Sequence, residues 1–250
     1  MRGLAPFWID PNDKTFRFPD VRLALPEPDG LLAVGGDLSP QRLQAAYRHG
    51  IFPWYNHDQP ILWWAPDPRA VLFPEHLKIS RSLQKTLRKN VFSITADKVF
   101  EEVVEACSGP RTSESNKNEE GDTGTWITPE MKQAYHQLHE IGVAHSVECW
   151  LNEKLVGGLY GVALGQVFFG ESMFTRVTDA SKVAFVHLVK QLTLWDYKLI
   201  DCQVYSAHLE SLGAESIRRE KFIHFLDLYC EGPGKPGPWQ MADSKNLLDY

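Results

Sequence analysis

The segment from Leu155 to Gly170 constrains the fold most, because it is the longest stretch without a charged residue and five glycines interrupt it. It is shorter than the ~20 apolar residues that span a bilayer. The turn-forming pairs Asn152-Glu153 and Gly165-Gln166 divide the surrounding sequence into apolar runs. This pattern predicts three strands, at about 145–151, 155–163 and 166–173, joined as an antiparallel meander.

The rest of the second half alternates between helical and strand-like periodicity. It predicts helices at 129–141, 180–195 and 216–229 and a strand at 198–205. The strand–helix–strand order between Val167 and Val204 is typical of a parallel crossover. A meander combined with a parallel crossover predicts an α+β fold with a C-terminal, acetyltransferase-like (GNAT-like) mixed sheet flanked by helices.

The first half has many Pro and Gly breaks and predicts a smaller N-terminal α/β domain. Ser39-Pro40 starts a helix that Gly50 ends, and two more helices are expected at about 80–90 and 97–107. The polar stretch 108–124 is expected to be a mobile loop. We expect an N-terminal domain over 1–75 and a C-terminal domain over 76–250 that includes the 80–90 helix and the loop.

Composition excludes several classes of protein. The 250 residues are 43% hydrophobic and 23% charged, which is ordinary for a globular protein. The cysteines at 107, 149, 202 and 230 form no CxxC pair. The N-terminus lacks the apolar core of a signal peptide, so we expect a cytoplasmic protein without membrane contact. His136 and His139 do not have a zinc-protease spacing, so we expect no metal, and no motif calls for a cofactor.

One predicted helix carries a concentrated positive charge in a chain whose net charge is −6. At 100° per residue its cations fall within about 100° of arc, while Leu83 and Leu87 point elsewhere. Cations without interleaved acids favour contact with a phosphate backbone, although a merely solvated face is an open alternative. The cations of this basic helix are Lys78, Arg81, Lys85, Arg88 and Lys89.

Tryptophan and polar strand residues supply further candidates. Trp54 and Trp126 lie in irregular segments, where indole rings either stack on bases or anchor a loop. Asp201 and Gln203 are two apart on a predicted strand, so their side chains are expected on one face. Glu171 interrupts an apolar strand, and a buried carboxylate there requires a partner or a function.

The chain resembles the leucyl/phenylalanyl-tRNA–protein transferases. The resemblance runs from about Phe18 to Phe225 and rests on motifs that occur in the family order. They include GLLAVGGDLSPQRLQAAYRHGIFPWY (30–55), ILWWAPDPRAVLFPE (61–75), HLKISRSL, GTWIT (124–128), AYHQLHE, LVGGLYGVA, FFGESMF, KLIDCQV and SLGA.

The resemblance implies an aminoacyltransferase. Such an enzyme moves Leu, Phe or, less well, Met from aminoacyl-tRNA to the α-amine of a protein beginning with Arg or Lys. The new peptide bond creates a degradation signal of the N-degron pathway. The resemblance also implies a C-terminal acetyltransferase-like fold. We expect a monomer.

The resemblance assigns roles to individual residues. Trp54 and Trp126 would contact the 3′-terminal adenosine and the aminoacyl end, and the basic helix would bind the acceptor stem. Glu171, Asp201 and Gln203 would organise the amine and the ester. The apolar side-chain pocket would be lined by Phe168, Ile200, Leu159 and Leu188, the last two in place of an expected Met and Phe.

Two alternatives come from other classes of protein. An acetyl-CoA N-acetyltransferase would share the sheet, but its pyrophosphate loop needs glycines that MFTRVTDASK lacks. A non-catalytic tRNA-binding module would explain the basic helix. It would leave Glu171, Asp201 and Gln203 without a purpose.

Overall fold

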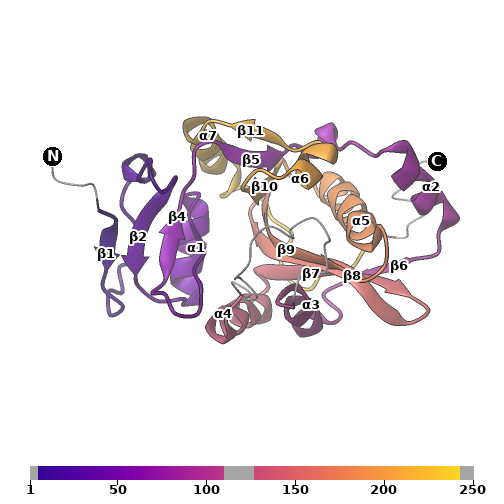
Figure 1. Cartoon of the computed structure of the whole chain (residues 1–250), viewed down its shortest axis with the longest axis horizontal. Coiled ribbons are helices and arrows are strands. Elements are labelled where there is room, and N and C mark those ends of the chain that lie inside the picture. The colour runs from indigo at the N-terminus through magenta and orange to yellow at the C-terminus, as the bar shows by residue number, and fades with distance from the viewer. Residues whose placement is uncertain (1–4, 110–126, 243–250) are drawn as a thin grey trace, which may run out of the picture.

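The computed structural model describes residues 5–109 and 127–242 and contains two sheets (Figure 1). The smaller sheet has the order β1-β2-β4-β3, and the larger has the order β11-β5-β10-β9-β8-β7-β6. The smaller sheet is built from β1 (Phe7–Ile9), β2 (Leu31–Gly35), β3 (Phe52–Pro53) and β4 (Leu62–Trp64). In the larger sheet β10 pairs with β9 in parallel and with β5 antiparallel, so the predicted mixed sheet is confirmed.

The predicted meander forms the centre of the larger sheet. Its strands are β7 (Ala144–Leu151), β8 (Lys154–Leu164) and β9 (Val167–Thr175). Asn152 and Glu153 both have positive φ angles, of 50° and 63°, as the tight turn between twisted strands requires. Gly165 has a φ of 54°, and a Cβ there would come within 2.3 Å of the Tyr229 carbonyl oxygen.

The predicted parallel crossover is also confirmed. Helix α5 (Ala180–Leu194) connects β9 to β10 (Leu199–Gln203), and the paired residues run from Val167 with Leu199 to Phe169 with Asp201. Helix α5 covers one face of the sheet, whereas α3 (Phe100–Cys107) and α4 (Pro129–Glu140) lie against the other (Figure 1). Beyond its last pair with β10, strand β9 stays paired with β8, and Glu171 lies where that second pairing shifts register between Tyr160 and Gly161.

Capping residues set the ends of the remaining predicted helices. Ser39 caps α1 (Pro40–Arg48), and Thr128 caps α4 through its side chain. Ser80 begins α2 (Arg81–Lys89), and Asn90 ends it in the left-handed conformation. The helix expected from residue 97 begins only at Phe100, because Asp97 has a φ of 54°.

Several short elements differ from the sequence prediction. Residues 216 and 217, expected to begin a helix, belong to strand β11 (Glu215–Ile217), and α7 spans Arg219–Tyr229. The strand expected to reach residue 205 ends at Gln203. Elements that the pattern did not indicate are β5 (Arg69–Leu72), β6 (Ser93–Ala96), α6 (Ala207–Ser211) and the 3-10 turns η1 (Val21–Leu23) and η2 (Pro74–His76).

The two sheets share one apolar core. Leu43 and Trp63 from the N-terminal part belong to the same buried cluster as Tyr160 and Phe169 of the larger sheet. The domain boundary after residue 75 stays a prediction, but sheet membership already changes between β4 and β5. Within the described ranges, no helix is both long and apolar enough to cross a membrane.

Candidate active site

Glu171 lies at the centre of a buried hydrogen-bonded cluster where β9 and β10 separate. Its Oε1 accepts hydrogen bonds from the Tyr47 hydroxyl and from Gln203 Nε2, both at 2.7 Å. Its Oε2 accepts one from the Tyr135 hydroxyl at 2.6 Å. Tyr47 comes from α1, Tyr135 from α4 and Gln203 from β10, so three separate elements hold one carboxyl group.

The environment of Glu171 favours its neutral form. Its side chain is only 9% exposed. Burial raises the pKa of Glu171 to about 7, and the charge of Asp201 adds to the increase, while hydrogen bonds from Tyr135, Tyr47 and Gln203 oppose it. Burial likewise raises the pKa of the Tyr47 and Tyr135 hydroxyls well above the ordinary value.

Counting hydrogens supports the same conclusion. The hydroxyl oxygens of Tyr47 and Tyr135 also lie 2.7 Å apart, so these two groups and Glu171 make three mutual O···O contacts. Two phenols supply only two hydrogens. A proton on Glu171 Oε2 supplies the third: Oε2 then donates to the Tyr135 hydroxyl instead of accepting from it, Tyr135 donates to Tyr47, and Tyr47 donates to Oε1, which completes the ring. The cluster is therefore fully satisfied when Glu171 is protonated.

Asp201 is fully buried and is bound by Arg69. Arg69 donates to both carboxylate oxygens of Asp201, from Nε at 2.8 Å and from Nη2 at 2.6 Å. The guanidinium lies between the rings of Phe52 and Phe222, each 4.7 Å from the ring centroid. This bidentate pair compensates both buried charges, although the Asp201 carboxylate still adds to the increase in the pKa of Glu171.

Gln203 occupies a strained position in β10. The pairing of β10 with β5 shifts register between Asp201 and Gln203, and Gln203 has a φ of 61°. Asp201 Oδ1 accepts a hydrogen bond from the Gln203 backbone N–H at 2.9 Å. This bulge interrupts the simple alternation assumed for Asp201 and Gln203, and it directs the Gln203 side-chain amide to Glu171. Bulges and left-handed non-glycine residues are concentrated at functional sites.

The residues expected to line the aminoacyl pocket form a closed core. All four are at most 3% exposed and belong to one cluster together with Trp239. Phe168 contacts the Trp239 ring at 5.9 Å between centroids. The assignment of an aminoacyl pocket to Phe168, Ile200, Leu159 and Leu188 stays a prediction.

The predicted nucleic-acid contacts lie on the surface where they are described. Trp54 is 46% exposed, and its ring lies 5.8 Å from that of Trp64. Trp126 lies outside the described residues. All five predicted cations are exposed, but only four lie on α2, because Lys78 precedes the helix; Leu83 and Leu87 are buried, as the helical periodicity predicts. Their contact with RNA stays a prediction.

Sequence reasoning missed three residues of the cluster. Arg69 is a charge inside the apolar strand β5, and the same signal that singled out Glu171 applies to it. Tyr47 and Tyr135 read as ordinary core positions of amphipathic helices. Among the described residues, no group of three or more His, Cys, Asp or Glu side chains is placed to hold a metal ion.

The fold and the site define an α+β protein whose mixed sheet opens around one buried, protonatable carboxyl group. Comparison with known proteins identifies the family. The chain matches the description "Leucyl/phenylalanyl-tRNA protein transferase" over residues 71–227 and the N-terminal domain of the same family over residues 36–67. It belongs to the leucyl/phenylalanyl-tRNA–protein transferase family.

Individual relatives cover nearly the whole chain. A leucyl/phenylalanyl-tRNA–protein transferase from Stutzerimonas stutzeri is 55% identical over 90% of this chain and 96% of the relative. One from Nitrosomonas europaea is 57% identical over 89% of this chain and 91% of the relative. A solved GCN5-related N-acetyltransferase from Kribbella flavida is 12% identical, covering 70% of this chain and 60% of that one, with a TM-score of 0.35.

Proposed function

We propose that the protein transfers Leu or Phe, and Met less well, from aminoacyl-tRNA to the α-amine of proteins that begin with Arg or Lys. Family membership supports the reaction class. The observation that carries the site assignment is the Gln203–Glu171 hydrogen bond of 2.7 Å in a buried, protonatable cluster. The protein acts as a cytoplasmic monomer without a cofactor, and its product carries a degradation signal.

The reaction is aminolysis of an ester. The acceptor nitrogen attacks the aminoacyl carbonyl carbon, a C–N bond forms, and the C–O bond to the ribose breaks. The nitrogen loses a proton and the departing ribose oxygen gains one. An α-amine with a pKa near 8 is partly neutral at pH 7, so alignment of the amine and the ester supplies much of the catalysis.

Gln203 orients the attacking amine. Its Nε2 is held by Glu171, whereas its Oε1 bonds to no residue that the structure describes. An amide oxygen accepts hydrogen bonds, so Oε1 receives an N–H of the amine and directs the lone pair toward the ester. Asp201 holds the Gln203 backbone in the bulge and is therefore a positioning residue.

Glu171 interacts with the cationic acceptor. The charge of Asp201 is neutralised by Arg69, which leaves Glu171 as the carboxyl group of the cluster able to respond to a positive charge. An arriving ammonium or guanidinium stabilises the carboxylate form, lowers the pKa of Glu171 and so promotes release of its proton. The proton can then pass to the ribose oxygen or to solvent.

The first experiment uses labelled Leu-, Phe- and Met-tRNA with a protein bearing N-terminal Arg. We expect acid-stable transfer that disappears when the N-terminal residue is changed to Ala. Gln203→Ala should lower kcat/KM by about a hundredfold, the low end for a group acting on a transferred proton. Glu153→Gln, in an exposed turn, is the matched control. Tight tRNA binding without any transfer would instead indicate a binding module.

A further inference from the structure

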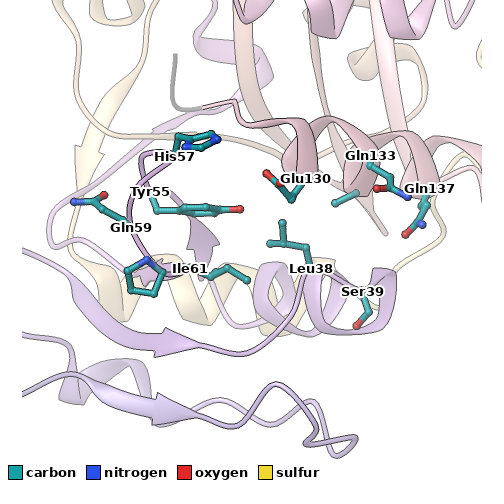
Figure 2. Close-up of a pocket in the computed structure, with 11 residues that line it drawn as sticks. Leu38, Ser39, Tyr55, His57, Gln59, Ile61, Glu130, Gln133 and Gln137 are labelled. Atoms are coloured by element: carbon teal, nitrogen blue, oxygen red, sulfur yellow. The ribbon is translucent and has the colours of Figure 1, made fainter. Parts of the chain in front are cut away.

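A pocket of about 570 Å³ lies apart from the Glu171 cluster, between the segment that joins β3 to β4 and helix α4. In Figure 2 the Tyr55 ring extends into it, His57 lies near the Tyr55 end, and Leu38 and Ile61 form an apolar side. Gln133 and Gln137 lie together at the other end. Its size is in the range of pockets that bind small molecules or short peptide segments.

Two amide side chains of α4, those of Gln133 and Gln137, are free to bind a ligand in the pocket. Neither the Gln133 nor the Gln137 amide bonds to another residue in the described part of the chain. Glu130 adds a carboxylate that faces the pocket (Figure 2). Primary amides supply both donors and acceptors, which is the pattern that a peptide backbone requires.

The same lining is unsuited to nucleic acid. None of the described residues that line the pocket is Lys or Arg, and Glu130 would repel a phosphate. Four exposed cations lie instead on α2, which is at the right-hand end of the molecule in Figure 1, away from α4. Of the two macromolecules in the proposed reaction, the pocket therefore fits the polypeptide.

We propose that this pocket binds the acceptor protein's chain several residues after its N-terminus, through backbone hydrogen bonds to Gln133 and Gln137 and attraction of a basic side chain to Glu130. The inference rests on the proposed function. Gln133 and Gln137 lie on roughly the opposite side of α4 from Tyr135, given 100° per residue. A helix is about 10–12 Å across and an extended chain spans ~3.3 Å per residue, so about four residues bridge the two sites.

Acceptor length provides the test. Transfer is measured to an Arg-initiated dipeptide, too short to reach the pocket, and to an unstructured Arg-initiated peptide of about ten residues. In the double variant Gln133→Ala with Gln137→Ala, the KM for the long acceptor should rise about tenfold, the loss expected for two neutral hydrogen bonds. The kinetic constants for the dipeptide and the KM for aminoacyl-tRNA should not change.

The variants separate this proposal from the proposed function. Glu130→Gln should raise the KM only for long acceptors with a basic residue near position five. Glu140→Gln, on α4 but outside the pocket, is the matched control. An unchanged KM for the long acceptor, or an equal increase for both acceptors, would overturn the pocket assignment. A higher KM for aminoacyl-tRNA would instead assign the pocket to RNA. Absence of transfer by the unaltered protein to both the dipeptide and the long acceptor would contradict the proposed function itself.

Discussion

The protonation state of Glu171 determines both the number of hydrogen bonds in the cluster and the charge of the site. With the proton, the contacts among Glu171, Tyr47 and Tyr135 each contain a hydrogen; without it, two phenolic oxygens meet with one hydrogen too few. Glu171 is therefore protonated before a cation binds. The amine and the ester react next to this carboxyl group, whose charge can change.

Replacement of Glu171 by Gln should reveal this proton through stability. A raised pKa stabilises the folded state fully below the unfolded value of about 4.5, and this contribution is lost as pH rises through about 7. Glu171→Gln keeps three hydrogens in the ring and carries no charge. Its free energy of unfolding relative to the unaltered protein should increase by about 3 kcal/mol between pH 4.5 and pH 8.

Urea unfolding across that pH range measures the difference. Glu153→Gln, in the exposed turn before β8, provides the matched substitution and should show no such trend. A pH-independent difference for Glu171→Gln would mean that Glu171 is already ionised at low pH in the folded protein.

The bulge in β10 is the element that distinguishes this sheet from a regular one. Gln203 has a φ of 61°, where a side chain costs about 1 kcal/mol relative to glycine. Gln203→Gly and Gln203→Ala both lose the hydrogen bond to Glu171, but only the glycine variant relieves the strain. We expect Gln203→Gly to unfold with a free energy about 1 kcal/mol higher than Gln203→Ala.

Chemical denaturation of both Gln203 variants tests the strain, and the transfer assay tests its purpose. Both variants should lose about the same hundredfold in kcat/KM, because the strained backbone serves only to place the Gln203 side-chain amide. If the alanine variant is as stable as the glycine variant, the left-handed conformation is not costly and the bulge needs a different explanation.

Helix α2 is the element whose role depends on charge alone. Its cations are exposed while Leu83 and Leu87 anchor it in the core, so substitutions of Lys85 and Lys89 should leave the fold intact. The double variant Lys85→Ala with Lys89→Ala should reduce the slope of log K for aminoacyl-tRNA against log salt by about 1.5, from two lost phosphate contacts. Lys154→Ala, at the exposed start of β8, should leave the slope unchanged.

A titration of tRNA binding between about 50 and 200 mM salt supplies the α2 slopes. An unaltered slope in the double variant would indicate that this face of α2 is simply solvated.

At the scale of the whole molecule, local patterns predicted the elements and missed the contacts between them. The meander and the crossover follow from turn residues and periodicity, which act over a few neighbours. Strand β5 has only four residues, and its place between β10 and β11 depends on partners more than 100 residues away in sequence. The pairing of Arg69 with Asp201 has the same long-range origin.

The candidate site likewise contains residues that local patterns predict and residues that they do not. Glu171, Asp201 and Gln203 were predicted because polar groups inside apolar strands require an explanation. Tyr47 and Tyr135 were not, because their rings satisfy the apolar pattern of a helix and only their hydroxyl groups enter the site. The left-handed conformation of Gln203 depends on the bulge, and no glycine or asparagine in the sequence indicates it.

The shared core makes a final prediction about cooperativity. Leu43 of α1 is fully buried in the cluster that also contains Tyr160 and Phe169. Leu43→Ala should lower the free energy of unfolding by about 2–5 kcal/mol. Because Tyr47 of the same helix binds Glu171, loosening α1 should also expose the larger sheet.

Hydrogen exchange distinguishes one cooperative unit from two. If there is one unit, the slowest amides of β2 and of β8 lose protection by the same free energy in Leu43→Ala. Leu192→Ala, on the buried side of α5, then also lowers the protection of both sets of amides. In two units, Leu43→Ala affects only the N-terminal sheet and leaves β8 unchanged. A single unit would mean that the N-terminal sheet is required to hold Glu171 in place, and that no truncated C-terminal sheet retains the tyrosine-bound carboxyl group.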